Sequence, residues 1–327
     1  MADGGHPIIL IIGDYLVACE AEDKSPWTVR WYGQKLAYFA AYLREHGGTT
    51  RLGAVGAAEV RRFIRHLQTE VRPGANNPHR SAEEGGLSPQ TVAGYVCTLR
   101  AFFSWTVREG LLAESPMRQV RTPRTPQRAM RTFADAEVTR LLDALRGTTP
   151  TAKRNHCILL VLLDTGIRVS ELVHLRMADL HLDLGYFQVL GKGRKERIVP
   201  LGRSSRRALS EYLRRYRPEP ALAASDGVFL THQGYPLRPN YVYRVVSRAC
   251  RQAGIAGKRV GPHTCRHTFA RNFLMNGGDL LTLQRILGHA SLEIVKLYVN
   301  LQTDDLVTQQ ARYSPMDALK ARSGGRR

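Results

Sequence analysis

Six residues between positions 168 and 298 carry side chains that together could cleave a phosphodiester. Each lies in a short phrase of its own: Arg168 in Asp-Thr-Gly-Ile-Arg-Val-Ser-Glu-Leu, Lys192 in Gly-Lys-Gly-Arg-Lys-Glu-Arg, His263 and Arg266 in His-Thr-Cys-Arg-His, His289 in Leu-Gly-His, and Tyr298 nine residues later. Two guanidiniums can hold an anionic phosphorus centre, an ammonium and two imidazoles can transfer protons, and a phenol can attack. The set therefore predicts phosphoryl transfer without a metal ion or other cofactor.

Each of these residues, taken singly, also has an ordinary structural explanation. Arg168 could form a helix ion pair with Glu171 three residues on, His289 could be a core or cap histidine, and Tyr298 could be a core aromatic. The Gly-Lys-Gly phrase around Lys192 lacks the Ser or Thr that a phosphate loop places directly after its lysine, so nucleotide binding is disfavoured. Only the complete set, in this order, favours a catalytic role over the structural ones.

The charge of the chain indicates a polyanionic partner. Its 327 residues include 48 Lys and Arg against 28 Asp and Glu, a formal net charge of +20 at pH 7. This excess favours nucleic acid, with an anionic membrane surface as the alternative. No apolar run reaches the length of about 18 residues that a membrane span needs. The apolar residues 8–12 follow no basic segment and are interpreted as the start of a buried helix.

Helical spacing places part of the catalytic set at a helix N-terminus. His263 and Arg266 are three residues apart and share a face of a helix that Pro262 would begin, where the helix dipole attracts anions. Lys192 lies instead in the turn of a predicted hairpin. The predicted strands of this hairpin are residues 186–190 and 197–201, and helices are predicted at residues 137–145, 154–163, 168–175, 203–216, 240–253, 263–275, 280–287 and after Ser291.

Two domains are expected at this length, because single cores stop growing at roughly 250–300 residues. A basic, proline-containing linker at residues 121–131 separates a helical domain, residues 1–120, from residues 132–327. Ser25 and Ser88 each precede a proline, a pair typical of a helix N-cap and first turn. The first domain is thus predicted to contain helices at residues 25–46, at residues 59–68 and from residue 88.

The aromatic residues of the helix from residue 88 recur at spacings of three and four, which is typical of core packing rather than of a base-stacking surface. The stripe consists of Val92, Tyr95, Val96, Leu99, Phe102 and Phe103. DNA would meet the charged outer face of this domain, where any single cation could also be an ordinary solvated residue. The candidate phosphate contacts are Arg30, Arg61, Arg62, Arg65 and Arg100. Residues 73–86 are polar and glycine-rich and are interpreted as a mobile insertion.

The cysteines indicate reduced thiols and a cytoplasmic location. Their number is odd and no Cys-x-x-Cys pair occurs. His263 and His267, four residues apart, could begin a zinc site, but no second pair at ligand spacing accompanies them. Zinc is therefore disfavoured.

The order Arg, Lys, His-x-x-Arg, Leu-Gly-His and Tyr resembles the tyrosine recombinase (phage integrase) family. The resemblance covers residues 131–301 and, more weakly, the helical domain before the linker, which resembles the family's core-binding domain. It implies a mainly α fold, with a helical N-terminal domain and a mixed α/β catalytic domain that contains a small antiparallel sheet. It also implies double-stranded DNA as the substrate, no cofactor, and a homo-tetramer on paired DNA sites, with accessory DNA-bending proteins as further partners.

The resemblance also assigns roles to the six residues. Tyr298 would attack the scissile phosphate to form a 3′-phosphotyrosyl link, and Lys192 would protonate the leaving 5′ oxygen. His263 would accept the tyrosine's proton, and His289 would hydrogen-bond the phosphate. Arg168 and Arg266 would stabilise the pentavalent phosphorus. Tyr241, Tyr243 and Tyr313 are the rival nucleophiles, and their positions relative to the His-x-x-Arg phrase favour Tyr298.

Three functions remain open: site-specific recombination, relaxation of supercoils by a type IB topoisomerase, and regulation by a DNA-binding protein that never cuts. The Leu-Gly-His phrase and the helical first domain disfavour the second, and the intact residue set disfavours the third. Among recombinases, the insertion at residues 73–86 and the tail from Ala311 to Asp317 favour integration or excision of a mobile element over the replicon-dimer resolution of Xer-type proteins. The segment at residues 306–319 could dock onto a neighbouring protomer or fold back on its own domain.

Overall fold

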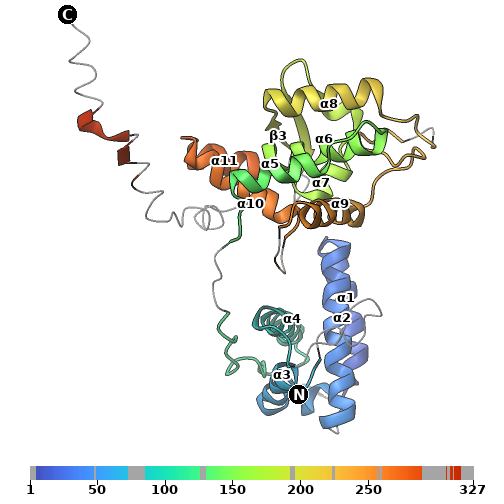
Figure 1. Cartoon of the computed structure of the whole chain (residues 1–327). Coiled ribbons are helices and arrows are strands. Elements are labelled where there is room, and N and C mark those ends of the chain that lie inside the picture. Colours follow the sequence, from blue (N-terminus) through green and yellow to red (C-terminus); the bar gives the residue numbers. More distant parts are fainter. Residues whose placement is uncertain are drawn as a thin grey trace, which may run out of the picture. The chain divides into compact units, whose positions relative to one another are not determined.

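The chain divides into two compact units, Met1–Arg128 and Ala129–Arg327, in the computed structural model (Figure 1). The structure describes residues 5–47, 49–72, 85–125, 130–191, 196–222, 225–255, 257, 260–288, 307, 310–311 and 313–317. Each unit has its own cluster of buried apolar side chains, and both are mainly helical, as the sequence predicts. The predicted insertion at residues 73–86 and the predicted helix after Ser291 lie largely outside the described residues.

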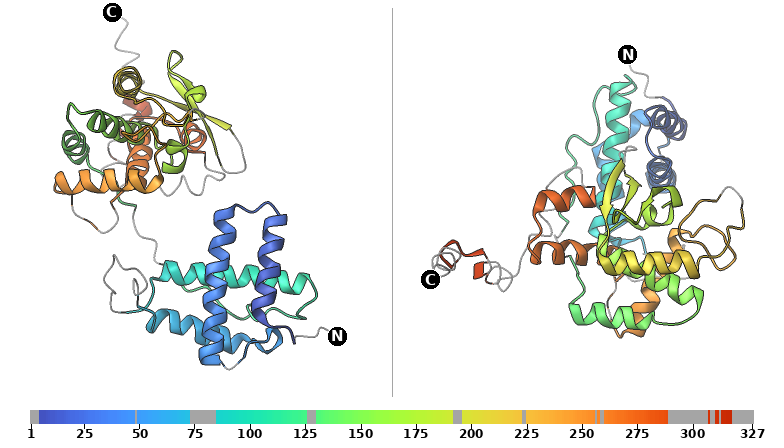
Figure 2. Two further views of the ribbon diagram at one scale, coloured as in Figure 1. Left: turned by 90° about the vertical axis from the view of Figure 1, so that its right-hand side faces the viewer. Right: turned by 90° about the horizontal axis from the view of Figure 1, so that it is seen from above.

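The described part of the first unit contains α1 (Ile8–Ala21), α2 (Pro26–Tyr42), α3 (Ala57–Thr69) and α4 (Pro89–Arg108). A π-helical turn, Leu43–Gly47, extends α2, and a short 3-10 turn, Leu52–Ala54, precedes α3. Figure 2 shows α1 and α2 side by side, with α4 crossing them. Ser25 and Ser88 cap α2 and α4 as predicted, because each hydroxyl accepts the backbone N–H three residues on, at 3.2 and 3.3 Å.

The aromatic stripe of α4 belongs to the core of the first unit. Val92, Val96, Leu99, Phe102 and Phe103 are at most 1% exposed, and Tyr95 is half-buried. The ring of Phe103 meets Phe39 of α2, which in turn lies against Phe63 of α3 with ring centroids 4.9 Å apart. The prediction of core packing rather than base stacking is confirmed.

The apolar run at residues 8–12 begins a helix, as expected, but it is buried on one side only. Ile8, Ile11 and Ile12 are at most 5% exposed, whereas Ile9 and Leu10 are 55% and 62% exposed. Only some residues of the continuous apolar run at the start of α1 therefore pack into the core.

The second unit contains most of the helices that the sequence predicts, with ends that differ from the predicted ones by at most four residues and, for α11, not at all. They are α5 (Asp135–Ala144), α6 (Pro150–Thr165), α7 (Val169–Val173), α8 (Arg203–Arg215), α9 (Pro239–Gln252), α10 (Pro262–Met275) and α11 (Leu280–Leu287), with a short 3-10 turn at Met177–Asp179. Thr149 and Asp279 cap α6 and α11 through their side chains. The central helix α6 packs against α8 and α10, and its Ile158, Leu159 and Val161 are fully buried.

A three-stranded antiparallel sheet covers part of this helical core. Its strands are β1 (Leu180–His181), β2 (Tyr186–Leu190) and β3 (Glu196–Pro200), in the order β1-β2-β3. The β2–β3 pairing runs from Tyr186 opposite Pro200 to Leu190 opposite Glu196, so the predicted hairpin is confirmed. Phe187, Val189 and Val199 face the core, and alternate residues face outward. The two-residue strand β1 was not predicted, because two residues are too few to show the alternation of apolar and polar side chains that indicates a strand.

The five cysteines are all free; four are buried and Cys97 is exposed. No helix among the described residues is long and apolar enough to cross a membrane.

Candidate active site

Three arginines from separate elements converge on the C-terminus of α11. A helix leaves its last carbonyls without internal partners and carries partial negative charge there, which favours cations. The donors are Arg197 Nε to Ile286 O at 2.7 Å, Arg266 Nη2 to Leu287 O at 2.8 Å, and Arg168 Nη2 to Gly288 O at 3.4 Å. The sequence-predicted Arg168 and Arg266 are thus brought together at the residue that directly precedes His289.

Gly288 permits this close approach. Its backbone lies in the left-handed region, at φ 63°, and ends α11 in the manner of a helix C-cap. A Cβ at this position would also lie 2.9 Å from Cδ and Nε of Arg197. Glycine is therefore favoured at this position of the Leu-Gly-His phrase both by its backbone conformation and by the lack of space for a side chain.

Arg168 stands at the N-terminus of α7, immediately after the turn that ends α6. Gly166 makes that turn at φ 60°, where a Cβ would come within 2.5 Å of Phe269. The Arg168 side chain is 34% exposed, and its Nη1 donates to Glu171 Oε1 at 2.8 Å. The helix ion pair that the sequence offered as an alternative role is therefore present, but part of the Arg168 side chain remains exposed.

Glu171 is held by two arginines rather than one. Arg197 of β3 donates a two-pronged fork to it, Nη1 to Oε1 at 2.8 Å and Nη2 to Oε2 at 2.7 Å. The backbone N–H of Arg168 adds a further hydrogen bond at 3.0 Å. Burial alone would raise the pKa of the Glu171 carboxyl, but the hydrogen bonds and charge of Arg197, with the bonds from Arg168, lower it overall. Glu171 is consequently an anion at neutral pH.

Arg197 is the site residue that sequence reasoning missed. It lies in the phrase that contains Lys192, yet nothing in its spacing distinguished it from the neighbouring Arg194 and Lys195. One signal was available: Arg197 belongs to a predicted strand that flanks the turn, where an inward-facing charge needs a partner.

The N-terminal half of α10 supplies His263 and Arg266, as predicted. Arg266 is only 5% exposed, and its Nη1 donates to Gly166 O at 2.6 Å in addition to its bond at α11. The His263 side chain reaches the surface, and desolvation of the covered part of its ring, with the charges of Arg266 and Arg168, lowers its pKa. The neutral imidazole therefore dominates at neutral pH and can accept a proton.

Lys192, His289 and Tyr298 lie outside the described residues, as does Lys195. The flanking structure is described on both sides of the hairpin turn, where β2 ends at Leu190 and β3 begins at Glu196. The assignment of these three side chains to the site stays a prediction.

The rival tyrosines differ in their surroundings. The hydroxyl of Tyr241 forms hydrogen bonds with Arg154 and Asn155, and the Arg154 guanidinium also lies over its ring, so it has a packing role. Tyr243 is 38% exposed, and its ring centroid lies 6.4 Å from that of His263. Tyr313 is 53% exposed. Tyr243 is therefore a rival whose ring lies near a catalytic candidate.

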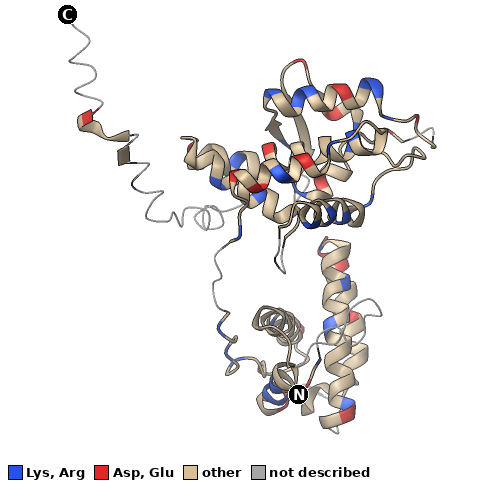
Figure 3. Ribbon diagram, in the orientation of Figure 1, with Lys and Arg blue, Asp and Glu red and all other residues tan. Residues whose placement is uncertain are grey.

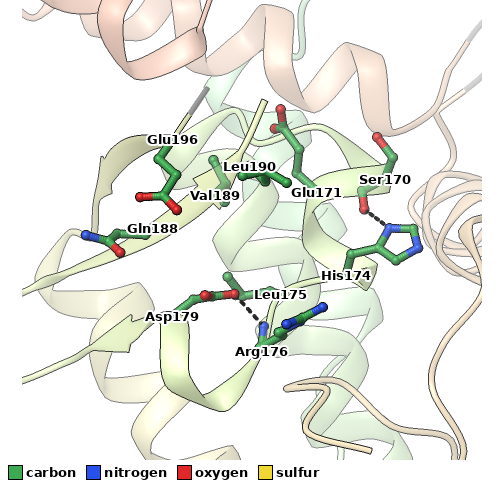
Figure 4. Close-up of a pocket in the computed structure, with 10 residues that line it drawn as sticks. All are labelled: Ser170, Glu171, His174, Leu175, Arg176, Asp179, Gln188, Val189, Leu190 and Glu196. Carbon is green, nitrogen blue, oxygen red and sulfur yellow. Dashed lines mark hydrogen bonds between the residues drawn. The ribbon is translucent and has the colours of Figure 1, made fainter. Parts of the chain in front are cut away.

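A cavity of about 500 Å³ opens beside the site, between α7 and strands β2 and β3 (Figure 4). Glu171, Asp179 and Glu196 line it, against one arginine, Arg176. This excess of carboxylates makes the cavity a poor phosphate site. The arginine cluster at α11, rather than the cavity, is where an anion is favoured.

Among the described residues, no third ligand lies close enough to His263 and His267 to share a metal ion with them. Burial above all, with the charges of His263 and Arg266, lowers the pKa of His267 to about 4. Within the described ranges, the group that offers three ligands in reach of one ion is His46, His66 and Glu70, in the first unit. Both ring nitrogens of His66 already have partners, Tyr38 at 3.2 Å and Glu70 at 2.7 Å.

Comparison with known proteins decides the family. The model of the phage integrase family matches residues 131–304, more than half of the chain. The chain belongs to the phage integrase family. This phage integrase family member is 33% identical over 276 residues to the tyrosine recombinase XerD of Listeria innocua, covering 84% of this chain and 88% of XerD. It is 33% identical over 291 residues to the XerC of Halalkalibacterium halodurans, covering 87% and 90%. It is therefore a tyrosine recombinase, an enzyme that breaks and rejoins DNA.

Solved structures of a site-specific recombinase and of a transposon integrase share the fold. The XerH site-specific recombinase bound to palindromic difH substrate aligns with a TM-score of 0.68 at 22% identity, over 91% of this chain and 82% of XerH. The Tn1549 transposon integrase in complex with circular-intermediate DNA aligns with a TM-score of 0.69 at 15% identity, over 94% and 99%. The predicted fold class is confirmed.

Proposed function

We propose that this recombinase cuts one DNA strand through a 3′-phosphotyrosyl link on Tyr298 and rejoins it to a strand of a second site. The observation that carries the proposal is the convergence of Arg168, at the start of α7, and Arg266, of α10, on the end of α11, with His263 three residues before Arg266 on the same helix. The C-cap of α11 directly precedes His289 in the chain. A corner with two guanidiniums and a neutral imidazole suits an anionic phosphorus centre that must be attacked by a hydroxyl.

The proposed step exchanges one phosphodiester for another. The Tyr298 oxygen bonds to phosphorus as the bond to the 5′ oxygen breaks; His263 takes the phenol's proton and Lys192 gives a proton to the leaving oxygen. Arg168 and Arg266 stabilise charge on the non-bridging oxygens, and His289 donates a hydrogen bond to the phosphate. The 5′-hydroxyl of the partner strand then attacks and releases the tyrosine. The two bonds are similar in energy, so the exchange requires no nucleotide hydrolysis.

DNA binding is proposed to use exposed arginines in both units. On α9, Arg244, Arg248 and Arg251 are exposed and spaced by four and three residues, so they share one helix face, and Figure 3 shows basic residues along α8 and α9. Such cations release counterions from DNA when they contact phosphates.

In the first unit, the predicted contacts Arg30, Arg61, Arg62, Arg65 and Arg100 are all exposed. Arg62 pairs with Glu59 at 2.6 Å, Arg100 donates to Val120 O at 3.0 Å, and Arg61 donates to Gln119 O at 3.5 Å. Arg30 and Arg65 are consequently the stronger candidates for phosphate contact. We propose that this unit is the core-binding domain and that residues 121–131 link it to the catalytic domain.

Assembly is proposed to be tetrameric on paired sites. A lambda integrase tetramer bound to a Holliday junction aligns with this chain at a TM-score of 0.67, which shows a shared fold at 18% identity. Accessory DNA-bending proteins remain a further proposed partner.

For the biological role, the relatives favour Xer-type resolution of replicon dimers over movement of a mobile element. The curated relatives at 29–33% identity carry the names XerD and XerC over 84–88% of the chain. The transposon integrase shares the fold at only 15% identity, so the fold does not separate the two roles. The insertion and tail that favoured a mobile element are outweighed by this similarity, and dimer resolution is the function we propose.

The test combines gene deletion with denaturing capture of covalent protein–DNA adducts in the host. Dimer resolution predicts adducts at one chromosomal site and an accumulation of dimeric circular DNA after deletion. Adducts at the two ends of an element, with loss of its excised circle after deletion, would contradict it. Relaxation of a plasmid that lacks the captured site would instead indicate a topoisomerase.

A further inference from the structure

We propose that Arg197 is a positioning residue that neutralises Glu171 and thereby leaves the charge of Arg168 available to the scissile phosphate. This inference rests on the proposed phosphate role of Arg168. Arg197 itself is poorly placed to touch DNA, because its side chain is 11% exposed and its guanidinium already bonds Glu171 twice and the carbonyl of Ile286 once.

The argument begins with the charge balance of the cluster. Glu171 is 7% exposed and remains an anion, so its charge must be compensated within the protein. With Arg168 as its only cationic partner, the pair would be neutral, and the carboxylate would compete with phosphate for the same guanidinium. Arg197 supplies the second positive charge through its fork. The cluster of Glu171, Arg197 and Arg168 therefore carries a net positive charge, located on the member that is 34% exposed.

The geometry agrees with this division of roles. Arg197 donates to both carboxylate oxygens of Glu171, at 2.8 and 2.7 Å, whereas the Arg168 side chain donates to Oε1 alone, at 2.8 Å. Arg168 reaches the α11 terminus through a long bond of 3.4 Å, which a phosphate oxygen can replace at little cost. Arg197 also fixes β3, five residues after Lys192, to the end of α11, so one side chain ties the hairpin to the arginine cluster.

The test compares cleavage of a normal site with cleavage of a site whose scissile phosphate carries a methyl group in place of one non-bridging oxygen. This methylphosphonate group is uncharged, so the loss of positive charge at Arg168 should slow its cleavage less than it slows cleavage of normal DNA. On normal DNA, Arg197→Met should slow single-turnover cleavage at saturating DNA by about 10²-fold, the scale of a misplaced catalytic group, while DNA affinity stays within about threefold. On the methylphosphonate, most of that loss should disappear, as it should for Arg168→Ala.

A matched control is Arg217→Met, because Arg217 also donates to backbone carbonyls, Val228 O and Gly227 O, at residues outside the proposed site. Its effect should be small and equal on both substrates. Arg197→Lys keeps the positive charge but cannot donate two parallel hydrogen bonds, so it should cleave faster than Arg197→Met and more slowly than wild type. It replaces Arg197→Met in the test if the methionine variant folds poorly. Glu171→Gln combined with Arg197→Met restores the charge balance and should be faster than Arg197→Met alone.

The outcomes separate the two claims. If Arg168→Ala is rescued by the methylphosphonate and Arg197→Met is not, the positioning role of Arg197 is wrong while the phosphate role of Arg168 stands. If Arg168→Ala is not rescued, the phosphate role fails and the inference about Arg197 fails with it. An Arg197→Met enzyme that cleaves normal DNA at the wild-type rate would also overturn the inference.

Discussion

Loss of Arg266 should cost both stability and cleavage, whereas loss of Arg168 should cost cleavage and little stability. Arg266 is 5% exposed and donates to Gly166 O at 2.6 Å and to Leu287 O at 2.8 Å. Hydrogen bonds to a charged group are worth about 1.5–3 kcal/mol each, so Arg266→Ala should lower the free energy of unfolding of the second unit by roughly 3–6 kcal/mol. That is a large share of the roughly 5–15 kcal/mol that stabilises a typical domain.

Arg168→Ala removes much weaker structural bonds. Its ion pair with Glu171 involves a side chain that is 34% exposed, and such screened pairs contribute about 0.3–1 kcal/mol. Glu171 keeps the fork from Arg197, and the bond to Gly288 O is long at 3.4 Å. The expected loss is about 1 kcal/mol or less. Both variants should nevertheless lose adduct formation, since each removes charge from the proposed phosphate site.

The distribution of tryptophans makes this measurable in the full chain. All three, Trp27, Trp31 and Trp105, lie in the first unit, so their fluorescence follows that unit during urea unfolding, and far-UV circular dichroism follows both. Arg266→Ala should shift the dichroism transition to lower urea and leave the fluorescence transition in place. Equal dichroism midpoints for Arg266→Ala and Arg168→Ala would refute the reasoning from burial.

The site gives three further predictions. Lys192→Ala should cleave normal DNA roughly 10²- to 10⁴-fold more slowly and recover on a 5′-phosphorothiolate, whose sulfur leaves without a proton; equal slowness on both substrates would mean that Lys192 is not the acid. The rate of cleavage at subsaturating DNA should fall as the pH is lowered, with a midpoint below about pH 6.5, because the lowered pKa of His263 keeps its imidazole neutral until lower pH. A midpoint above that pH would contradict the role of His263 as proton acceptor. Replacing Arg244, Arg248 and Arg251 of α9 together by alanine should reduce the slope of log affinity against log salt by about 0.9 for each phosphate that the variant no longer neutralises; an unchanged slope would remove α9 from the DNA interface.

The helices could be predicted from the sequence because their signals are local. The Ser-Pro caps of α2 and α4 and the spacing from Val92 to Phe103 each depend on neighbours within one or two helical turns. β1 could not be predicted, since its two residues are strands only through pairing with Phe187 and Tyr186. Burial of α1 on one side also depends on packing between elements, which a uniform apolar run does not encode.

The site could be predicted in part. Arg168 and Arg266 stood out by their phrases, and the structure brings them together. The carbonyls of α11 that accept from these arginines, and the fork of Arg197 on Glu171, join residues 21 to 120 positions apart, and no local spacing reports such contacts. Arg197 could not be predicted as a site residue because its partners lie far from it in the chain, not because its chemistry is unusual.

The most direct test of the central claim is formation of a covalent adduct on a nicked suicide substrate, analysed on a denaturing gel. Wild type, Tyr243→Phe and Tyr313→Phe should each give a shifted protein–DNA band, and Tyr298→Phe should bind the same DNA but give none, because only the attacking hydroxyl is lost. Tyr243→Phe is the stringent control, since that ring lies 6.4 Å from His263. An adduct that persists in Tyr298→Phe and disappears in Tyr243→Phe or Tyr313→Phe would contradict the account.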